Sequence, residues 1–238
     1  ANFNNASNTY ETVAGVQKIA AKFLVQKLLD NKIPAIKTIL DLGTGTGYIP
    51  ELLLPTYPNS YYVLNDIAQQ MLEVCKIKFH SQPNFTFLKG DMSTIQLPTS
   101  ELIISNFAMQ WINNLAPMLE KCYAQSEKCF AFSTLLSTTF QEWENILATQ
   151  INHYPTQQQL LNYCQKINIM NCAFNSWAIE IPITFGNLRE FIYYLKTLGA
   201  NSANVTIPIP RLKNILKTNN SQITVSYQIF FGIFKKAD

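Results

Sequence analysis

The segment that decides the fold lies at positions 39–48 and reads Ile39-Leu40-Asp41-Leu42-Gly43-Thr44-Gly45-Thr46-Gly47-Tyr48. The mainly apolar run over residues 38–42 predicts a buried strand, and the three glycines after it predict a turn into a helix over residues 48–54. Glycines let the backbone of such a turn approach a ligand, and the start of a helix presents free amide groups. Ligands of open α/β sheets bind beyond the carboxyl ends of the strands, so this is either a ligand site or simply a tight turn.

Strands and helices alternate along the rest of the chain. The predicted strands cover residues 61–65, 85–88, 102–105, 129–134, 177–185 and 223–234. The predicted helices cover residues 11–30, 68–79, 116–123, 140–151, 188–198 and 210–217. This alternation is typical of βαβ units, and short strands that are apolar on both faces require a sheet covered by helices. The predicted fold class is α/β: a doubly wound, Rossmann-like, mostly parallel seven-stranded sheet with an antiparallel last strand and helical insertions near the C-terminal third.

The composition excludes several classes of protein. Hydrophobic residues make up 47% of the 238 residues and charged residues 14%, which predicts a folded chain with a large core. A net charge of +3 does not require a nucleic-acid partner, and we expect none. The five cysteines form no C-x-x-C pair, which predicts reduced thiols, no metal site and a cytoplasmic protein. We also expect no signal peptide and no membrane-spanning segment.

The spacing of the glycines indicates which ligand binds at the turn. A dinucleotide site has the pattern G-x-G-x-x-G and rests a pyrophosphate on the helix start, whereas this segment has G-x-G-x-G directly after Asp41. S-adenosylmethionine has no phosphate, and its amino-acid end carries an ammonium group that Asp41 is well placed to bind. The pattern therefore predicts an S-adenosylmethionine site that includes Asp41, Gly43, Gly45 and Gly47, and it disfavours an NAD-dependent oxidoreductase.

Polar residues also follow the next three predicted strands. Asp66 ends the second strand, where a carboxylate can accept hydrogen bonds from both ribose hydroxyls; its alternative role is to cap the next helix. Asp91 and Met92 follow the third strand, where we expect Asp91 to bind the adenine amino group and Met92 to pack on the ring; the alternative is a simple turn. Asn106 follows the fourth strand and is expected to face the methyl donor. The joint placement of these residues at successive strand ends favours the cofactor site.

Residues 36–135 resemble the class I methyltransferase family, whose motifs are an acidic-glycine turn, an acidic end to the second strand and a Gly-Asp pair after the third. Further segments resemble one subgroup, the malonyl-[acyl-carrier protein] O-methyltransferases of biotin synthesis, over nearly the whole chain. These segments are residues 3–10 with Ala14 and Gln17, 105–111, 132–135, 183–186, 195–200, 224–227 and 231–232. Residues 201–210 depart from the pattern of the subgroup.

The resemblance implies that a methyl group passes from S-adenosylmethionine to the free carboxylate of a malonyl thioester on acyl-carrier protein, forming a methyl ester for biotin (pimeloyl) synthesis. It also implies that Gln17 and Ile67 help to bind the cofactor, and that Phe107, Gln110 and Trp111 line the substrate pocket. A carboxylate is ionised at neutral pH and needs no general base, so alignment and the removal of water would be the main contributions of the enzyme.

Three further residues are candidates for the catalytic machinery. Arg211 and Lys196 are candidates for holding the malonyl carboxylate, because cationic side chains suit that task. Tyr10 is a candidate for closing over the methyl group. Each has an alternative role, as a solvent-exposed helix residue for Lys196 and Arg211 and as a packing residue for Tyr10.

Other functions and the organisation of the chain stay open at this point. In a second hypothesis the acceptor is another small carboxylic acid or a quinone precursor. In a third hypothesis the protein is a methyltransferase-like subunit without catalysis. We predict a monomer and a single methyltransferase domain over residues 1–238. Its expected parts are an N-terminal helical lid over 1–33, a cofactor-binding core over 36–151, a substrate-side insertion over 152–220 and the last strand over 221–238.

Overall fold

The computed structural model describes residues 2–33, 35–150, 152–167, 172–197, 209–218 and 221–237, with the backbone alone at residues 2–14, 197, 209–210, 213 and 218. The helices in this part of the chain are α1 (Asn2–Asp30), α2 (Tyr48–Leu53), α3 (Gln69–Lys78), the 3-10 turn η1 (Met109–Trp111), α4 (Leu115–Gln125), α5 (Gln141–Leu147), α6 (Gln157–Ile167), α7 (Leu188–Thr197) and α8 (Ile209–Thr218). The strands are β1 (Thr38–Leu42), β2 (Tyr61–Asp66), β3 (Phe85–Lys89), β4 (Ser100–Ser105), β5 (Ser126–Leu135), β6 (Cys172–Phe185) and β7 (Ile223–Lys236).

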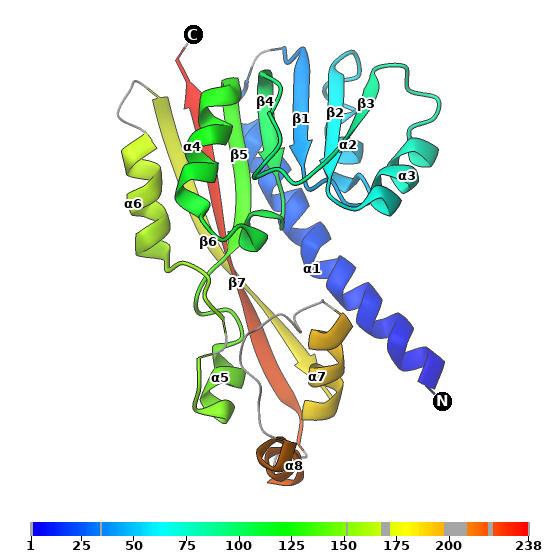
Figure 1. Cartoon of the computed structure of the whole chain (residues 1–238), viewed down its shortest axis with the longest axis vertical. Coiled ribbons are helices and arrows are strands. Elements are labelled where there is room, and N and C mark those ends of the chain that lie inside the picture. Colours follow the sequence, from blue (N-terminus) through cyan, green and yellow to red (C-terminus); the bar gives the residue numbers. More distant parts are fainter. Residues whose placement is uncertain are drawn as a thin grey trace. The chain divides into compact units, whose positions relative to one another are not determined.

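The seven strands form one sheet in the order β3-β2-β1-β4-β5-β7-β6 (Figure 1). The first five run parallel, since β1 pairs in parallel with β2 and β4, β2 with β3, and β4 with β5. In sequence order, β1, β2 and β3 follow one another toward one edge of the sheet, whereas β4 and β5 follow one another toward the other edge. The order therefore reverses between β1 and β4, which is the point where open α/β sheets bind their ligands.

The last strand, β7, runs antiparallel to both of its neighbours. Against β5, Phe130 stacks on Phe234 while Phe132 contacts Phe230, so the residue numbers rise on one strand as they fall on the other. Against β6, Thr184 bonds to Thr224 while Glu180 bonds to Gln228. The predicted antiparallel last strand in a mostly parallel sheet is thereby confirmed.

The chain divides into two compact units, and each is described by itself. The sheet unit consists of residues 18–134, 157–178 and 230–238, and the aromatic unit of residues 1–17, 135–156 and 179–229. The expectation of a single methyltransferase domain with four parts stays a prediction. Among the helices that the structure describes, none is long and apolar enough to cross a membrane.

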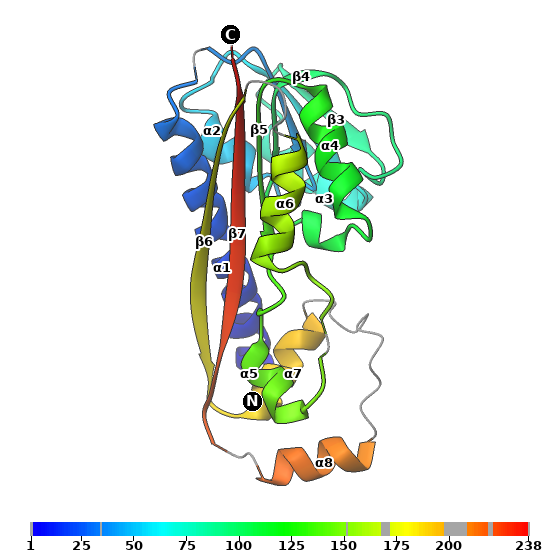
Figure 2. The ribbon, with the colours of Figure 1, turned by 90° about the vertical axis from the view of Figure 1, so that its left-hand side faces the viewer.

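The core of the sheet unit is built on strands that are apolar on both faces. All six residues of β4 and four of the five in β1 are buried, as parallel strands covered by helices require. Figure 2 shows α4 and α6 on one side of the sheet and residues 18–30 of α1 on the other. That part of α1 buries Ala20, Leu24 and Leu28 at four-residue spacing. The burial of each leucine side chain stabilises the folded state by about 1.5–3 kcal/mol.

The aromatic unit has a small core of its own. Phe191 and Tyr194 of α7 pack on Phe185 at the end of β6, and Phe191 also packs on Phe140 and Trp143 beside and within α5. The hydroxyls of Tyr194 and Tyr227 are 2.8 Å apart in the buried interior, where burial raises the pKa of Tyr194 to about 12. These phenols therefore stay protonated at neutral pH.

Several elements differ from the prediction. The helix expected over residues 140–151 is shorter, because Phe140 and Ala148 both have left-handed backbone angles (φ +59° and +46°) that bound α5. Helix α6 was not predicted, although its buried residues Leu160, Cys164 and Ile167 have helical spacing. Its many polar residues concealed that signal. Helix α1 begins at Asn2 and not at residue 11, β6 begins at Cys172 and not at residue 177, and the 3-10 turn η1 was not predicted. The remaining predicted elements are confirmed to within a few residues over the described part of the chain; Leu198 and Gly199 lie outside it.

Candidate functional site

The three glycines of the turn between β1 and α2 all have left-handed backbone angles, but their surroundings differ. A Cβ atom on Gly43 would lie 2.3 Å from the Cβ of Ala108, and one on Gly47 would lie 2.7 Å from the ring of Phe79. A Cβ atom on Gly45 would meet nothing within 4 Å. Gly43 and Gly47 are thus required for packing, whereas Gly45 borders open space in which a ligand can contact the backbone.

Asp41, near the end of β1, is a buried carboxylate that lacks a full set of partners. Its side chain is 1% exposed, and Oδ2 accepts no hydrogen bond from any residue that the structure describes. Burial, together with the negative charge of nearby Asp66, raises the pKa of Asp41 to about 7. A buried acceptor of this kind fits the ammonium group of S-adenosylmethionine, which would supply both a hydrogen bond and the missing positive charge.

Asp66, at the end of β2, ties the glycine turn to the start of α3. Its Oδ2 accepts a hydrogen bond from the Gly45 amide at 2.9 Å, and its Oδ1 accepts one from the Ala68 amide at 2.8 Å. The bond to Ala68 is not the predicted helix cap, because Ala68 is itself the N-cap residue of α3 and no side chain caps that helix. Each carboxylate oxygen has two lone pairs, so Asp66 can still accept hydrogen bonds from ribose hydroxyls. Ile67 beside it is 67% exposed, which fits an apolar residue that a flat ligand would cover.

The loop after β3 carries Asp91 and Met92. Asp91 Oδ1 accepts hydrogen bonds from the amide and the hydroxyl of Ser93, and these two bonds lower the pKa of Asp91, which is therefore ionised at neutral pH. A Cβ atom on Gly43 would lie 3.3 Å from Cε of Met92, so this loop and the glycine turn adjoin each other. The carboxyl ends of β1, β2 and β3 thus bring residues that were predicted to bind the cofactor close together.

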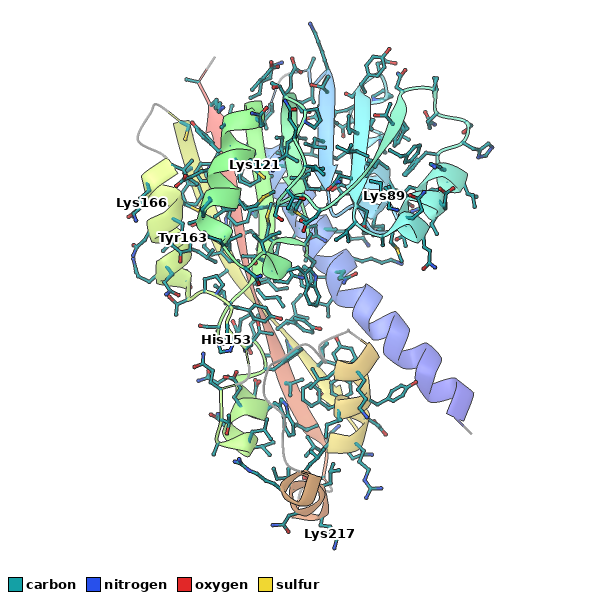
Figure 3. All side chains as sticks on the ribbon, in the orientation of Figure 1. Lys89, Lys121, His153, Tyr163, Lys166 and Lys217 are labelled. Atoms are coloured by element: carbon teal, nitrogen blue, oxygen red, sulfur yellow. The ribbon has the colours of Figure 1, made fainter. Side chains whose placement is uncertain are left out.

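Lys121 holds this loop from the neighbouring helix. It projects from α4 (Figure 3), and its ammonium donates to the carbonyl oxygens of Met92, Ser93 and Ile95 at 3.0, 3.2 and 2.7 Å. An ammonium group has three donor hydrogens, which match the three carbonyls. Sequence reasoning missed Lys121, because nothing in its local pattern distinguishes it from other lysines on the surface of a helix.

Replacing Lys121 with methionine is expected to raise the Kd for S-adenosylmethionine about tenfold, because a loosened loop must be ordered again on binding. Titration calorimetry measures the change. Lys76→Met is the matched control, since Lys76 lies on α3, where its ammonium forms an exposed ion pair with Glu73 at 2.8 Å and lies over the ring of Phe87. Equal affinities for the two variants would show that the loop needs no support from Lys121.

The turn after β4 carries the remaining predicted residues of this unit. The hydroxyl of Ser133 donates to Oδ1 of Asn106 at 2.8 Å and accepts a hydrogen bond from the Phe107 amide at 3.0 Å. Gln110 donates through Nε2 to the Phe107 carbonyl at 2.7 Å, and its Oε1 is buried without a partner among the described residues. Trp111 is 58% exposed, as a residue that lines an open pocket can be.

Asn65 is a second residue that sequence reasoning missed. Its backbone carbonyl accepts a hydrogen bond from the Thr44 amide at 2.9 Å, and its Nδ2 donates to the carbonyls of Leu88 and Gly90 at 2.9 and 3.0 Å. It therefore links β2 to the glycine turn and to the loop after β3. A buried asparagine at the end of an otherwise apolar strand is the signal that could have identified it.

Four predicted residues belong to the aromatic unit. Tyr10 and Gln17 lie on α1, with the side chain of Tyr10 outside the described part of the structure. Lys196 is exposed in the last turn of α7. Arg211 on α8 donates to the carbonyl of Leu147, the last residue of α5, so it caps that helix. The functional roles predicted for these four residues stay predictions, as do the roles of individual residues in the sheet unit.

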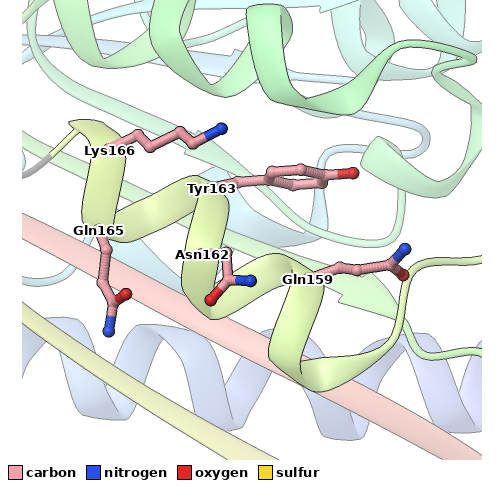
Figure 4. Close-up of a pocket in the computed structure, with 5 residues that line it drawn as sticks. All are labelled: Gln159, Asn162, Tyr163, Gln165 and Lys166. Atoms are coloured by element: carbon pink, nitrogen blue, oxygen red, sulfur yellow. The ribbon is translucent and has the colours of Figure 1, made fainter.

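A surface hollow lies apart from these strand ends. Figure 4 shows its lining residues, which all come from α6: Gln159, Asn162, Tyr163, Gln165 and Lys166. None of the predicted site residues lines it. Within the described residues, no group of three or more His, Cys, Asp or Glu side chains could hold a metal ion.

The glycine turn, the buried carboxylate and the acidic ends of β2 and β3 define a class I S-adenosylmethionine-dependent methyltransferase. In agreement, residues 39–127 match a family model described as a methyltransferase domain. The chain belongs to the malonyl-[acyl-carrier protein] O-methyltransferase family. Its relative of that name from Priestia megaterium is 34% identical over 221 residues, which cover 85% of this chain and 80% of the relative. The relative from Neorickettsia risticii is 29% identical over 245 residues, which cover 100% of this chain and 95% of the relative.

A solved structure confirms the predicted fold class. The YcgJ protein from Bacillus subtilis is similar to this chain with a TM-score of 0.65 and 12% identity, over 90% of this chain and 98% of that protein. At this identity the similarity concerns the fold alone. The family resemblance predicted from the sequence is confirmed by the curated relatives.

Proposed function

We propose that this protein transfers a methyl group from S-adenosylmethionine to the free carboxylate of a malonyl thioester carried by an acyl-carrier protein. The buried, incompletely partnered carboxylate of Asp41 beside a glycine turn that is open at Gly45 carries the proposal for the cofactor. The similarity to malonyl-[acyl-carrier protein] O-methyltransferases over the whole chain supports the acceptor. The methyl ester would serve biotin (pimeloyl) synthesis.

The chemistry needs little from ionisable side chains. When bound, S-adenosylmethionine supplies a methyl group on a positively charged sulfonium, which is a good leaving group. The acceptor carboxylate is already ionised at neutral pH and can attack without a general base. This agrees with the positions of the two histidines in the sequence, His80 and His153, which are both exposed.

The residues of the site then have binding and positioning roles. Asp41 holds the ammonium end of the cofactor, Asp66 the ribose and Asp91 the adenine, while Met92 and Ile67 pack on the ring. Phe107, Gln110 and Trp111 line the acceptor side and exclude water from the attacking carboxylate. Tyr10, Lys196 and Arg211 are our candidates for contacting the malonyl group, and Gln17 is our candidate for a further cofactor contact. We further propose that the protein acts as a cytoplasmic monomer, without a nucleic-acid or membrane partner.

The preferred acceptor is tested by competition. Equal concentrations of malonyl-acyl-carrier protein, malonyl-coenzyme A and free malonate are incubated with the protein and labelled S-adenosylmethionine, and the three esters are quantified. We expect the carrier-protein ester to dominate by at least about tenfold, because contacts to the carrier raise kcat/KM for that acceptor. Faster methylation of free malonate would show that the acceptor is a small carboxylic acid and not the carrier-protein thioester.

A further inference from the structure

The turn that follows β4 has an unfavourable backbone conformation. Phe107 has φ +55°, in the left-handed region that residues with a side chain rarely adopt, and it is only 9% exposed. A bulky residue stays in this region only where its surroundings hold it there, and such residues concentrate at functional sites. The contacts that hold Phe107 therefore indicate what fixes this edge of the site.

Two of these contacts are the hydrogen bond that Gln110 donates to the Phe107 carbonyl at 2.7 Å and the hydroxyl of Ser133 on β5. Ser133 is 0% exposed, and its hydroxyl accepts the hydrogen bond of the Phe107 amide at 3.0 Å while it donates to Asn106 Oδ1 at 2.8 Å. The strand register explains this position, since Ser105 pairs with Phe132 and the next residue of β5 therefore lies opposite Asn106. One buried hydroxyl thus fixes two consecutive residues of the turn.

The turn is connected to the glycine turn by direct packing. A Cβ atom on Gly43 would lie 2.3 Å from Cβ of Ala108, so the residue after Phe107 already lies against the backbone of the glycine turn. Ser105, the last residue of β4, donates to the Leu42 carbonyl at 2.9 Å. A shift of residues 106–108 would therefore change the position of the acceptor side relative to the cofactor turn.

We infer that Ser133 is a positioning residue for methyl transfer. It is buried beneath the turn and acts through Asn106 and Phe107, which it holds in the arrangement that aligns the acceptor with the methyl group. This inference rests on the proposed function. Alignment of the reacting atoms is sensitive to small displacements, so the loss of the hydroxyl should lower kcat more than it weakens cofactor binding.

The test compares two serines on the same strand. Ser126 is also buried (1% exposed), and its hydroxyl donates to the Tyr123 carbonyl at 2.8 Å, far along β5 from the turn. We expect Ser133→Ala to lower kcat at least about tenfold with the KM for S-adenosylmethionine changed by less than about threefold. Ser126→Ala should keep the kcat of the unmodified protein, although it also removes a buried hydroxyl; it loses one hydrogen bond, whereas Ser133→Ala loses two.

Two further variants complete the test. Ser133→Thr retains a hydroxyl and is expected to recover most of kcat, whereas Ser133→Cys, a substitution of similar size with a weakly hydrogen-bonding thiol, is expected to lose it as the alanine variant does. Equal kcat values for Ser133→Ala, Ser133→Cys and Ser126→Ala would overturn the inference. The failure of the proposed function is distinguishable, because the unmodified protein would then form no methyl ester on malonyl-acyl-carrier protein.

Discussion

Replacing Asp41 with asparagine is expected to weaken S-adenosylmethionine binding at least about 100-fold at about pH 8. The carboxylate is buried and its Oδ2 has no hydrogen-bond partner among the described residues, so the cofactor ammonium would gain both a hydrogen bond and a charge partner there. Asparagine keeps the size of the side chain but removes the charge. Titration calorimetry gives the two affinities, and Asp30→Asn, at an exposed position on α1, is the matched control.

The same substitution is expected to stabilise the protein without its cofactor. The pKa of Asp41 is raised from 3.8 to about 7, so the folded state binds more protons than the unfolded state between these values. The free energy of unfolding therefore falls as the pH rises through this window, by at most about 4 kcal/mol. Asparagine does not ionise, so Asp41→Asn removes this pH-dependent loss of stability. The Tm of the variant should therefore exceed that of the unmodified protein at about pH 8 but not at about pH 4.

The pH dependence of cofactor binding has the opposite direction. An ammonium ligand favours the ionised carboxylate, so the affinity of the unmodified protein should rise as the pH rises through about 7. The affinity of Asp41→Asn should lack this dependence. An unchanged Kd in the variant, or a pH dependence that persists in it, would show that Asp41 does not bind the ammonium group.

Alanine at Gly43 and alanine at Gly45 are expected to have different effects. Both glycines have left-handed backbone angles (φ +68° and +54°), so each substitution introduces strain of about 1–2 kcal/mol. At Gly43 the new methyl group would also lie 2.3 Å from Ala108, which forces the turn apart. We expect Gly43→Ala to lower the free energy of unfolding by about 3 kcal/mol or more.

Gly45→Ala tests the ligand space directly. The new methyl group meets no protein atom within 4 Å, so only the backbone strain should lower the stability. The methyl group would enter the space assigned to the cofactor, and we expect the Kd for S-adenosylmethionine to rise at least about tenfold. Thermal denaturation and calorimetry on both variants separate the two effects. Gly15→Ala, within helix α1, is the control and should raise stability by about 0.5–1 kcal/mol. Unchanged cofactor binding by Gly45→Ala would show that the cofactor does not occupy the space beside Gly45.

Local patterns predicted most of the parallel sheet and the strand ends that carry the proposed cofactor residues. β1 and the glycine turn are encoded within ten consecutive residues, and the carboxylates of Asp66 and Asp91 follow strands that can be recognised by their apolar character. The parallel pairing then necessarily brings these strand ends to one edge of the sheet. Such features depend on near neighbours in the sequence, which is why the sequence predicts them well.

The supporting contacts could not be predicted in the same way. Ser133 reaches Phe107 because of the register between β4 and β5, and Lys121 reaches the loop after β3 from a helix 26–29 residues further along the chain. Both contacts depend on tertiary packing and leave no local signal. The end of α5 at Ala148 depends on a single left-handed residue, which an apolar pattern does not indicate.

The most direct measurement is the mass of malonyl-acyl-carrier protein after incubation with S-adenosylmethionine and the purified protein. We expect an increase by one methyl group in place of a proton, located on the malonyl carboxylate by fragmentation, and a much slower increase with Asp41→Asn at a cofactor concentration that just saturates the unmodified protein. A carrier protein of unchanged mass, with S-adenosylmethionine bound but not consumed, would show that the protein does not methylate the malonyl carboxylate.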